Sequence, residues 1–179
     1  MILELPRRTA LAVALANLIL PALRPVPAHA MEVAEYKKLL ETTVKEAVSG
    51  SIGNPDATAA RLEQALKLAI DGAKAYVAKE PAHTRVFDAL IGSIESLKSK
   101  KADDVEAEWG EDGRQFAAHG FDLKKNDQFS TAKSHVDVIV HPTLAIALLN
   151  EFRKSKDAAL LDRMKAELVE AVEHADHLK

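Results

Sequence analysis

The sequence predicts an all-α fold, an antiparallel helical bundle of about four to six helices with an irregular, glycine-containing insertion between its halves. Two observations lead to this prediction. Apolar residues recur every three or four positions through most of the chain after residue 30, as they do on the buried face of a helix. Most of the glycines and prolines in that region fall at breaks between these apolar stripes.

The first half of the bundle is predicted to contain three helices. Asn54 is suited to cap the second helix, because its side chain can accept hydrogen bonds from the first turn, and Pro55 fits that first turn. The second helix should end before Pro81, since the residue before a proline is displaced from the helical region. The three apolar stripes span residues 33–47, 62–76 and 87–97.

The insertion and the second half follow. Between residues 98 and 128 the apolar spacing becomes irregular, and three glycines interrupt it, which predicts one or two short helices. Helical spacing resumes at residues 129–140, where Pro142 should kink or end the helix. Residues 143–152 and 161–175 form the last helical stripes, with a break near residues 155–157.

Residues 131–141 leave two interpretations open. The stretch from His135 to His141 alternates and contains several valines, which is typical of a strand. A single strand without a partner leaves its backbone hydrogen bonds unmade, so helix is favoured.

The first 30 residues have the three parts of a secretory signal peptide. Arg7 and Arg8 precede an apolar run at 11–23, and the small-x-small sequence 28–30 predicts cleavage near Ala30. The run is shorter than the roughly 20 residues that a membrane span needs. We therefore expect a periplasmic or secreted bacterial protein with no span after cleavage, and a single helical domain at 31–179. A twin-arginine signal and a start at Met31 are the alternatives.

Charge and cysteine content exclude several classes of function. Removing residues 1–30 takes away three arginines and one glutamate, so the formal net charge moves from −3 to −5. A negative chain without a basic patch is a poor nucleic-acid binder. The sequence has no cysteine, which excludes disulfides, thiolate metal sites and covalently attached haem.

The first candidate site is a metal site at the end of the chain. Glu170, His174 and His177 are spaced by four and three residues, so their side chains stack along one side of a helix and could hold a divalent ion such as zinc. A helical wheel places all three on the outer face, away from the apolar stripe. The site therefore requires an irregular segment or a second protomer to pack over it.

A second group of ionisable residues, His135, Asp137 and His141, converges only if the segment is extended. As a helix, we expect these three side chains to point to different faces.

The second candidate site is a ligand pocket walled by aromatic residues around the insertion. Rings that cluster beside a glycine-containing, acidic stretch can enclose a small ligand, although they can equally fill that end of the core. The candidate residues are Trp109, Phe116, His119 and Phe121.

No catalytic residues are predicted, because no serine lies in a nucleophile elbow and no glycine-rich phosphate loop is present. The leading hypothesis is an exported, non-enzymatic binding or accessory protein that holds a small ligand or a metal ion. The alternatives are a periplasmic interaction module, such as an assembly factor or chaperone, and a metal-dependent enzyme. The sequence leaves open the identity of any cofactor and whether the chain forms a homodimer.

Overall fold

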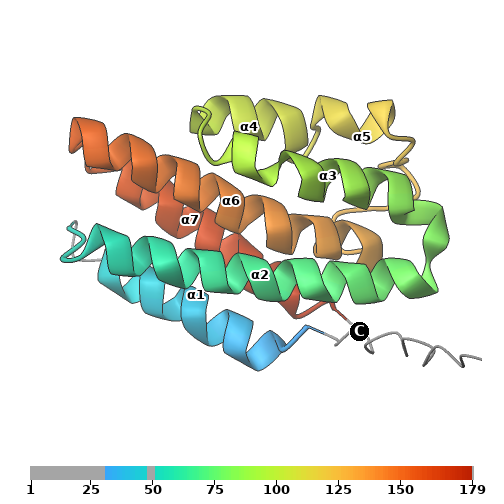
Figure 1. Ribbon diagram of the computed structural model, residues 1–179, viewed down its shortest axis with the longest axis horizontal. Coiled ribbons are helices and arrows are strands. Elements are labelled where there is room, and N and C mark those ends of the chain that lie inside the picture. The colour runs from blue at the N-terminus through green and yellow to red at the C-terminus, as the bar shows by residue number, and fades with distance from the viewer. Residues whose placement is uncertain (1–30, 48–50, 179) are drawn as a thin grey trace, which may run out of the picture.

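The protein is all-helical in a computed structural model, which describes residues 31–47 and 51–178 (Figure 1). Those residues form seven α-helices and one short 3-10 turn, with no strand, so the predicted all-α fold is confirmed. The predicted signal peptide and its cleavage point lie outside the described residues, as does Gly50. The helices are α1 (Val33–Ala47), α2 (Pro55–Lys79), α3 (Thr84–Leu97), α4 (Ala102–Trp109), α5 (Arg114–Ala118), α6 (Thr131–Ser155) and α7 (Ala159–Ala175), and the turn is η1 (Pro81–His83).

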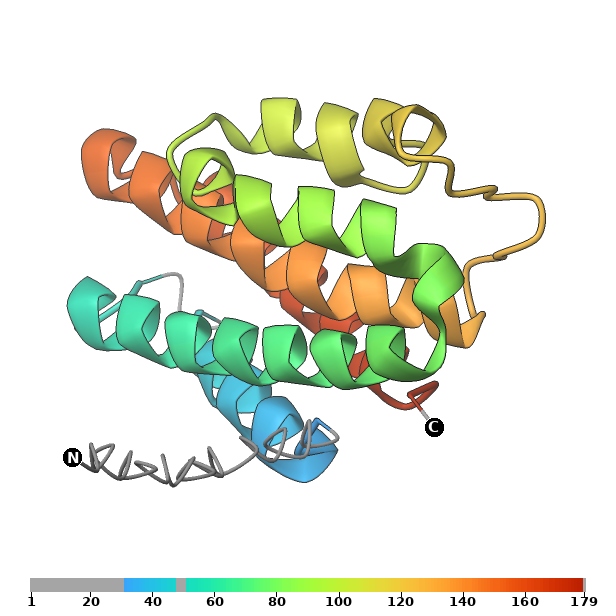
Figure 2. The same ribbon diagram turned by 45° about the vertical axis from the view of Figure 1, so that its right-hand side comes forward.

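Four helices form the bundle. The helices α1, α2, α6 and α7 pack in a ring, and each runs antiparallel to its neighbours (Figures 1 and 2). The helix α3 lies against α2 and α6, and α4 lies against α6. The two short helices α4 and α5 are the predicted insertion; α4 packs against α6, and α5 packs against α4 (Figure 2).

Local capping residues define where the long helices begin and end. The side chain of Asn54 accepts hydrogen bonds from the backbone N–H groups of Asp56 and Ala57, both at 3.1 Å, as the sequence predicted. The hydroxyl of Ser130 accepts one from Lys133 at 3.2 Å and so begins α6. At the other end of α6, Lys156 has a left-handed backbone with φ of 60°, which turns the chain toward α7.

The prediction that Pro142 kinks or ends its helix is wrong about the ending, because α6 continues through Pro142 to Ser155. Residues 131–141 are accordingly helix and not strand. Proline lacks the N–H that would bond the carbonyl of Val138, four residues earlier. The hydroxyl of Tyr36, on α1, donates to that carbonyl at 2.8 Å. A side chain from a neighbouring helix thus replaces the missing backbone donor.

Candidate metal centre

A cleft of about 220 Å³ lies between α6 and α7, beneath the segment that contains α4 and α5. Gly110, Glu111 and Gln128 of that segment contribute to its wall. The rest of the lining is rich in ionisable side chains from the two long helices. Its acidic residues are Glu106, Glu111, Asp137, Glu167 and Glu170.

Asp137 forms the floor of the cleft, and its side chain is only 4% exposed. Its Oδ1 accepts a hydrogen bond from the ammonium group of Lys133, one turn earlier on α6 and equally buried. Its Oδ2 accepts no hydrogen bond from any residue that the structure describes. A buried carboxylate oxygen without a donor is costly in free energy, so this oxygen is available to a cation.

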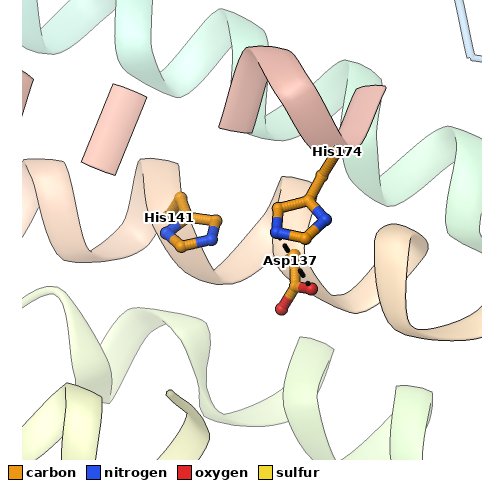
Figure 3. A group of neighbouring side chains, drawn as sticks. All are labelled: Asp137, His141 and His174. Atoms are coloured by element: carbon orange, nitrogen blue, oxygen red, sulfur yellow. Dashed lines mark ion pairs between the residues drawn. The ribbon is translucent and has the colours of Figure 1, made fainter. Parts of the chain in front are cut away.

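His174 reaches Asp137 from α7. Its Nε2 lies 3.5 Å from Oδ2 of Asp137, a distance that is too long for a good hydrogen bond (Figure 3). The side chain is buried, and burial lowers the pKa of His174 more than the carboxylate of Asp137 raises it. The neutral imidazole that results has a nitrogen lone pair, which is the form that binds metals.

His141 lies beside His174, with the two rings nearly parallel and their centroids 5.5 Å apart (Figure 3). Its Nδ1 is 2.9 Å from Oε2 of Glu167. A histidine that donates Nδ1–H to a carboxylate presents the lone pair of Nε2, and metal-binding histidines commonly have this partner. That Nε2 lies 3.8 Å from a carboxylate oxygen of Glu170 at the mouth of the cleft.

Glu170 is the most exposed member of the group, at 58% of its side chain. Partial burial raises its pKa, and the neighbouring carboxylates of Glu167 and Glu173 raise it further, whereas His141 opposes them. A cation in the cleft would relieve this repulsion among carboxylates.

Each of the two helices supplies a carboxylate followed by a histidine one turn later. Asp137 and His141 are one turn apart on α6, and Glu170 and His174 are one turn apart on α7. Because the helices are antiparallel, each carboxylate meets the histidine of the other helix. The short connection around Lys156 sets this register.

The arrangement offers two overlapping sets of metal ligands. Asp137, His141 and His174 each place one ligand atom within 4.8 Å of the others. His141, Glu167 and Glu170 form a second set by the same measure. The ligand atoms of a tetrahedral zinc ion are about 3.3 Å apart, as bonds of about 2.0–2.1 Å require. Small rotations of side chains on two fixed helices would close that difference.

The structure places the three predicted metal ligands differently from the expectation that they share an outer face. The expectation that Glu170, His174 and His177 share an outer face is wrong for His174, which is 5% exposed. The helix α7 packs against both α1 and α6, so its buried arc is wider than the apolar stripe. Glu170 and His174 line the cleft, whereas His177 lies outside it against the ring of Phe129, at 4.8 Å between centroids.

The expectation that a helical His135, Asp137 and His141 all point to different faces is also wrong. Asp137 and His141 are separated by four residues and share a face of α6. His135 alone points elsewhere, toward the ring of Tyr76 at 4.6 Å between centroids. The sequence signal that was missed is the Asp-x-x-x-His pair on α6 opposite the Glu-x-x-x-His pair on α7.

The aromatic residues of the predicted ligand pocket pack on one another. Trp109 and Phe116 are each 1% exposed, with rings at 89° and centroids 5.7 Å apart. Phe121 is buried against Phe116, and His119 stacks on Trp109. None of the four lines the cleft between α6 and α7. This packing is the second interpretation that the sequence allowed, in which the rings fill one end of the core.

Comparison of the chain with family models, with curated proteins and with solved structures finds no match in any of the three. Among the helices in the described part of the chain, none is long and apolar enough to cross a membrane.

Proposed function

We propose that the protein binds a divalent metal ion in the cleft between α6 and α7 and acts as an exported binding or accessory protein. One observation carries the proposal: a buried aspartate and two histidines from two antiparallel helices converge, and one oxygen of that aspartate accepts no hydrogen bond from the residues that the structure describes. Two more carboxylates lie next to this group. Export rests on the signal-like sequence of residues 1–30 alone.

Each residue has a distinct role in the proposed site. Asp137 binds the ion through Oδ2, and His141 and His174 bind it through Nε2. Glu170, at the mouth, completes a fourth position. Glu167 does not bind the ion but orients His141 through the contact to Nδ1, which keeps the lone pair of Nε2 directed toward the metal.

The donor set favours zinc. Two imidazole nitrogens and one or two carboxylate oxygens form a common tetrahedral zinc environment, and they also suit iron(II), cobalt and nickel. The many surrounding carboxylates add long-range attraction for any cation.

Zinc titration in competition with a chromophoric chelator tests the proposal. The purified protein should bind one zinc ion, and His141→Gln should weaken binding on the order of 100-fold, since loss of a supporting residue alone costs about 10–100-fold. His177→Gln is the matched control, because it removes the same group from the same end of the bundle but outside the cleft. Equal effects of the two variants, or no zinc binding by the unmodified protein, would refute the proposed site.

A further inference from the structure

Lys133 places a positive charge inside the proposed metal site. Its side chain is 5% exposed, it lines the same cleft, and its ammonium group is hydrogen-bonded to Asp137. The ammonium also lies 5.3 Å from the centroid of the Phe116 ring, which faces it from the insertion. The cleft therefore contains a cation that belongs to the chain itself.

Burying the ammonium group of Lys133 costs free energy, and its contacts offset only part of that cost. An ammonium group has three hydrogen-bond donors, and the structure gives one of them a partner, Asp137. Removing two charges from water is expensive, and apolar residues of the same volume would often serve stability equally well. A buried Lys–Asp pair at the centre of a ligand set thus points to a role in binding.

We infer that Lys133 holds Oδ1 of Asp137 when no divalent ion is bound, and that an ion arriving at the neighbouring Oδ2 repels the ammonium group and displaces it from the carboxylate. The inference rests on the metal site proposed above and concerns how its affinity is set. A unit charge and a divalent ion a few ångströms apart repel strongly in the interior of a protein. Lys133 therefore weakens metal binding, and it keeps the carboxylate of Asp137 paired in the absence of metal.

The cleft provides a second position for the displaced group. Glu106 and Glu111 line the same cavity on the side of the insertion. The flexible four-carbon stem of a lysine allows its ammonium group to turn toward them while its Cα stays on α6. In this exchange the singly charged ammonium group beside Asp137 gives way to a doubly charged ion, and no covalent bond breaks.

The test compares zinc affinity in Lys133→Met and in Lys125→Met. Both variants lose one positive charge, but the Lys125 side chain is 82% exposed, and its ammonium group lies 3.8 Å from a carboxylate oxygen of Asp122. Lys133→Met should bind zinc at least about tenfold more tightly than the unmodified protein, a change of about 1.4 kcal/mol. Lys125→Met should bind as the unmodified protein does. Equal or weaker binding by Lys133→Met, while the unmodified protein binds zinc, would overturn the role of Lys133 and leave the metal site intact.

Binding by neither protein would refute the metal site itself, and the inference with it. Binding by Lys133→Met alone would also overturn the inference, because an unmodified protein that holds no zinc has no ion to displace the ammonium group.

A second measurement uses the unmodified protein, because Lys133→Met removes the hydrogen-bonded partner of Asp137 and should be less stable. Lysine labelling with an amine-reactive ester, read by peptide mass spectrometry, should find Lys133 protected without zinc and labelled with it. Labelling of Lys125 should not change. Continued protection of Lys133 in zinc-saturated protein would contradict displacement.

Discussion

The helix α6 carries two histidines in very different surroundings, of which His135 is buried and His141 is half-buried. His141 faces the cleft, where Glu167 lies 2.9 Å from one nitrogen and a second histidine is stacked beside it. His135 faces a different side of the helix and lies against the ring of Tyr76, whose hydroxyl pairs with His83 instead. No carboxylate is in contact with His135 among the described residues, and its Nδ1 has no hydrogen-bond partner there.

The difference shows that burial alone does not prepare a histidine for metal binding. Around His135 burial acts unopposed and lowers its pKa to about 4, so the ring stays neutral but has no second ligand nearby. Around His141 and His174, carboxylates lie close enough to supply the remaining ligands of the proposed site and the negative charge that a cation would require. What distinguishes the two regions is the presence of acids on the facing helix, not the histidines themselves.

The largest expected effect comes from removing the acid that distinguishes the cleft. Asp137→Asn leaves the charge of Lys133 buried without a counterion, and breaking such a pair costs about 3–5 kcal/mol. The free energy of unfolding, measured by urea denaturation, should fall by that amount, and zinc should no longer bind. Asp127→Asn, at an exposed position just before α6, is the control and should leave both properties unchanged. A loss below about 1 kcal/mol in Asp137→Asn would show that the buried pair is not formed.

The second expected effect concerns how the burial of His135 makes the stability of the protein depend on pH. Its pKa is about 4 in the folded protein and 6.5 when unperturbed, so the unfolded chain takes up this proton first as the pH falls. The free energy of unfolding should therefore decrease between pH 6.5 and pH 4, by about 3 kcal/mol at 1.36 kcal/mol per pKa unit. His135→Leu should remove this part of the acid sensitivity, as urea denaturation at pH 7 and pH 4 would show. An unchanged pH dependence in the variant would mean that His135 titrates normally.

The third effect concerns the backbone between the two histidines. Tyr36→Phe removes the donor to the carbonyl of Val138, and a buried unsatisfied carbonyl costs about 1–3 kcal/mol. In a Pro142→Ala background the alanine N–H can bond that carbonyl, so the same substitution should cost less. A double-mutant cycle of unfolding free energies measures the difference. Identical costs in both backgrounds would show that the tyrosine does not compensate for the proline.

The smallest effect tests the support of His141. Glu167→Gln keeps an oxygen near Nδ1 but removes the charge, and zinc affinity should fall about tenfold. Glu41→Gln, an exposed residue on α1, is the matched control. If both variants bind zinc equally well, Glu167 does not orient the ligand.

Local patterns in the sequence predicted most of the fold. Apolar periodicity located the long helices, and Asn54 and Pro55 marked the start of α2, because each of these signals acts within a few residues. The continuation through Pro142 was not predictable locally, since its compensation comes from Tyr36, 102 residues away along the chain from Val138.

The candidate site was only partly predictable, because convergence depends on which face of α7 meets α6. The sequence predicts Glu170 and His174 as candidate ligands, but it predicts that Asp137 and His141 do not converge in a helix. A usable signal was present in the spacing about the turn at Lys156. Asp137 precedes that residue by 19 positions and His174 follows it by 18, while His141 precedes it by 15 and Glu170 follows it by 14. Distances from a tight turn that agree to within one residue predict contact between antiparallel helices.

The position of Trp109 gives the protein an internal optical reporter. It is the only tryptophan in the chain, it is buried at the end of α4, and the next residue, Gly110, lines the cleft. Its indole stacks on His119 and contacts Phe116, the ring that faces the ammonium of Lys133. Emission from a single chromophore therefore responds to rearrangement at this one place, and a paramagnetic ion such as copper(II) in the cleft would quench it. Occupancy of the cleft can thus be followed by fluorescence without attaching a dye.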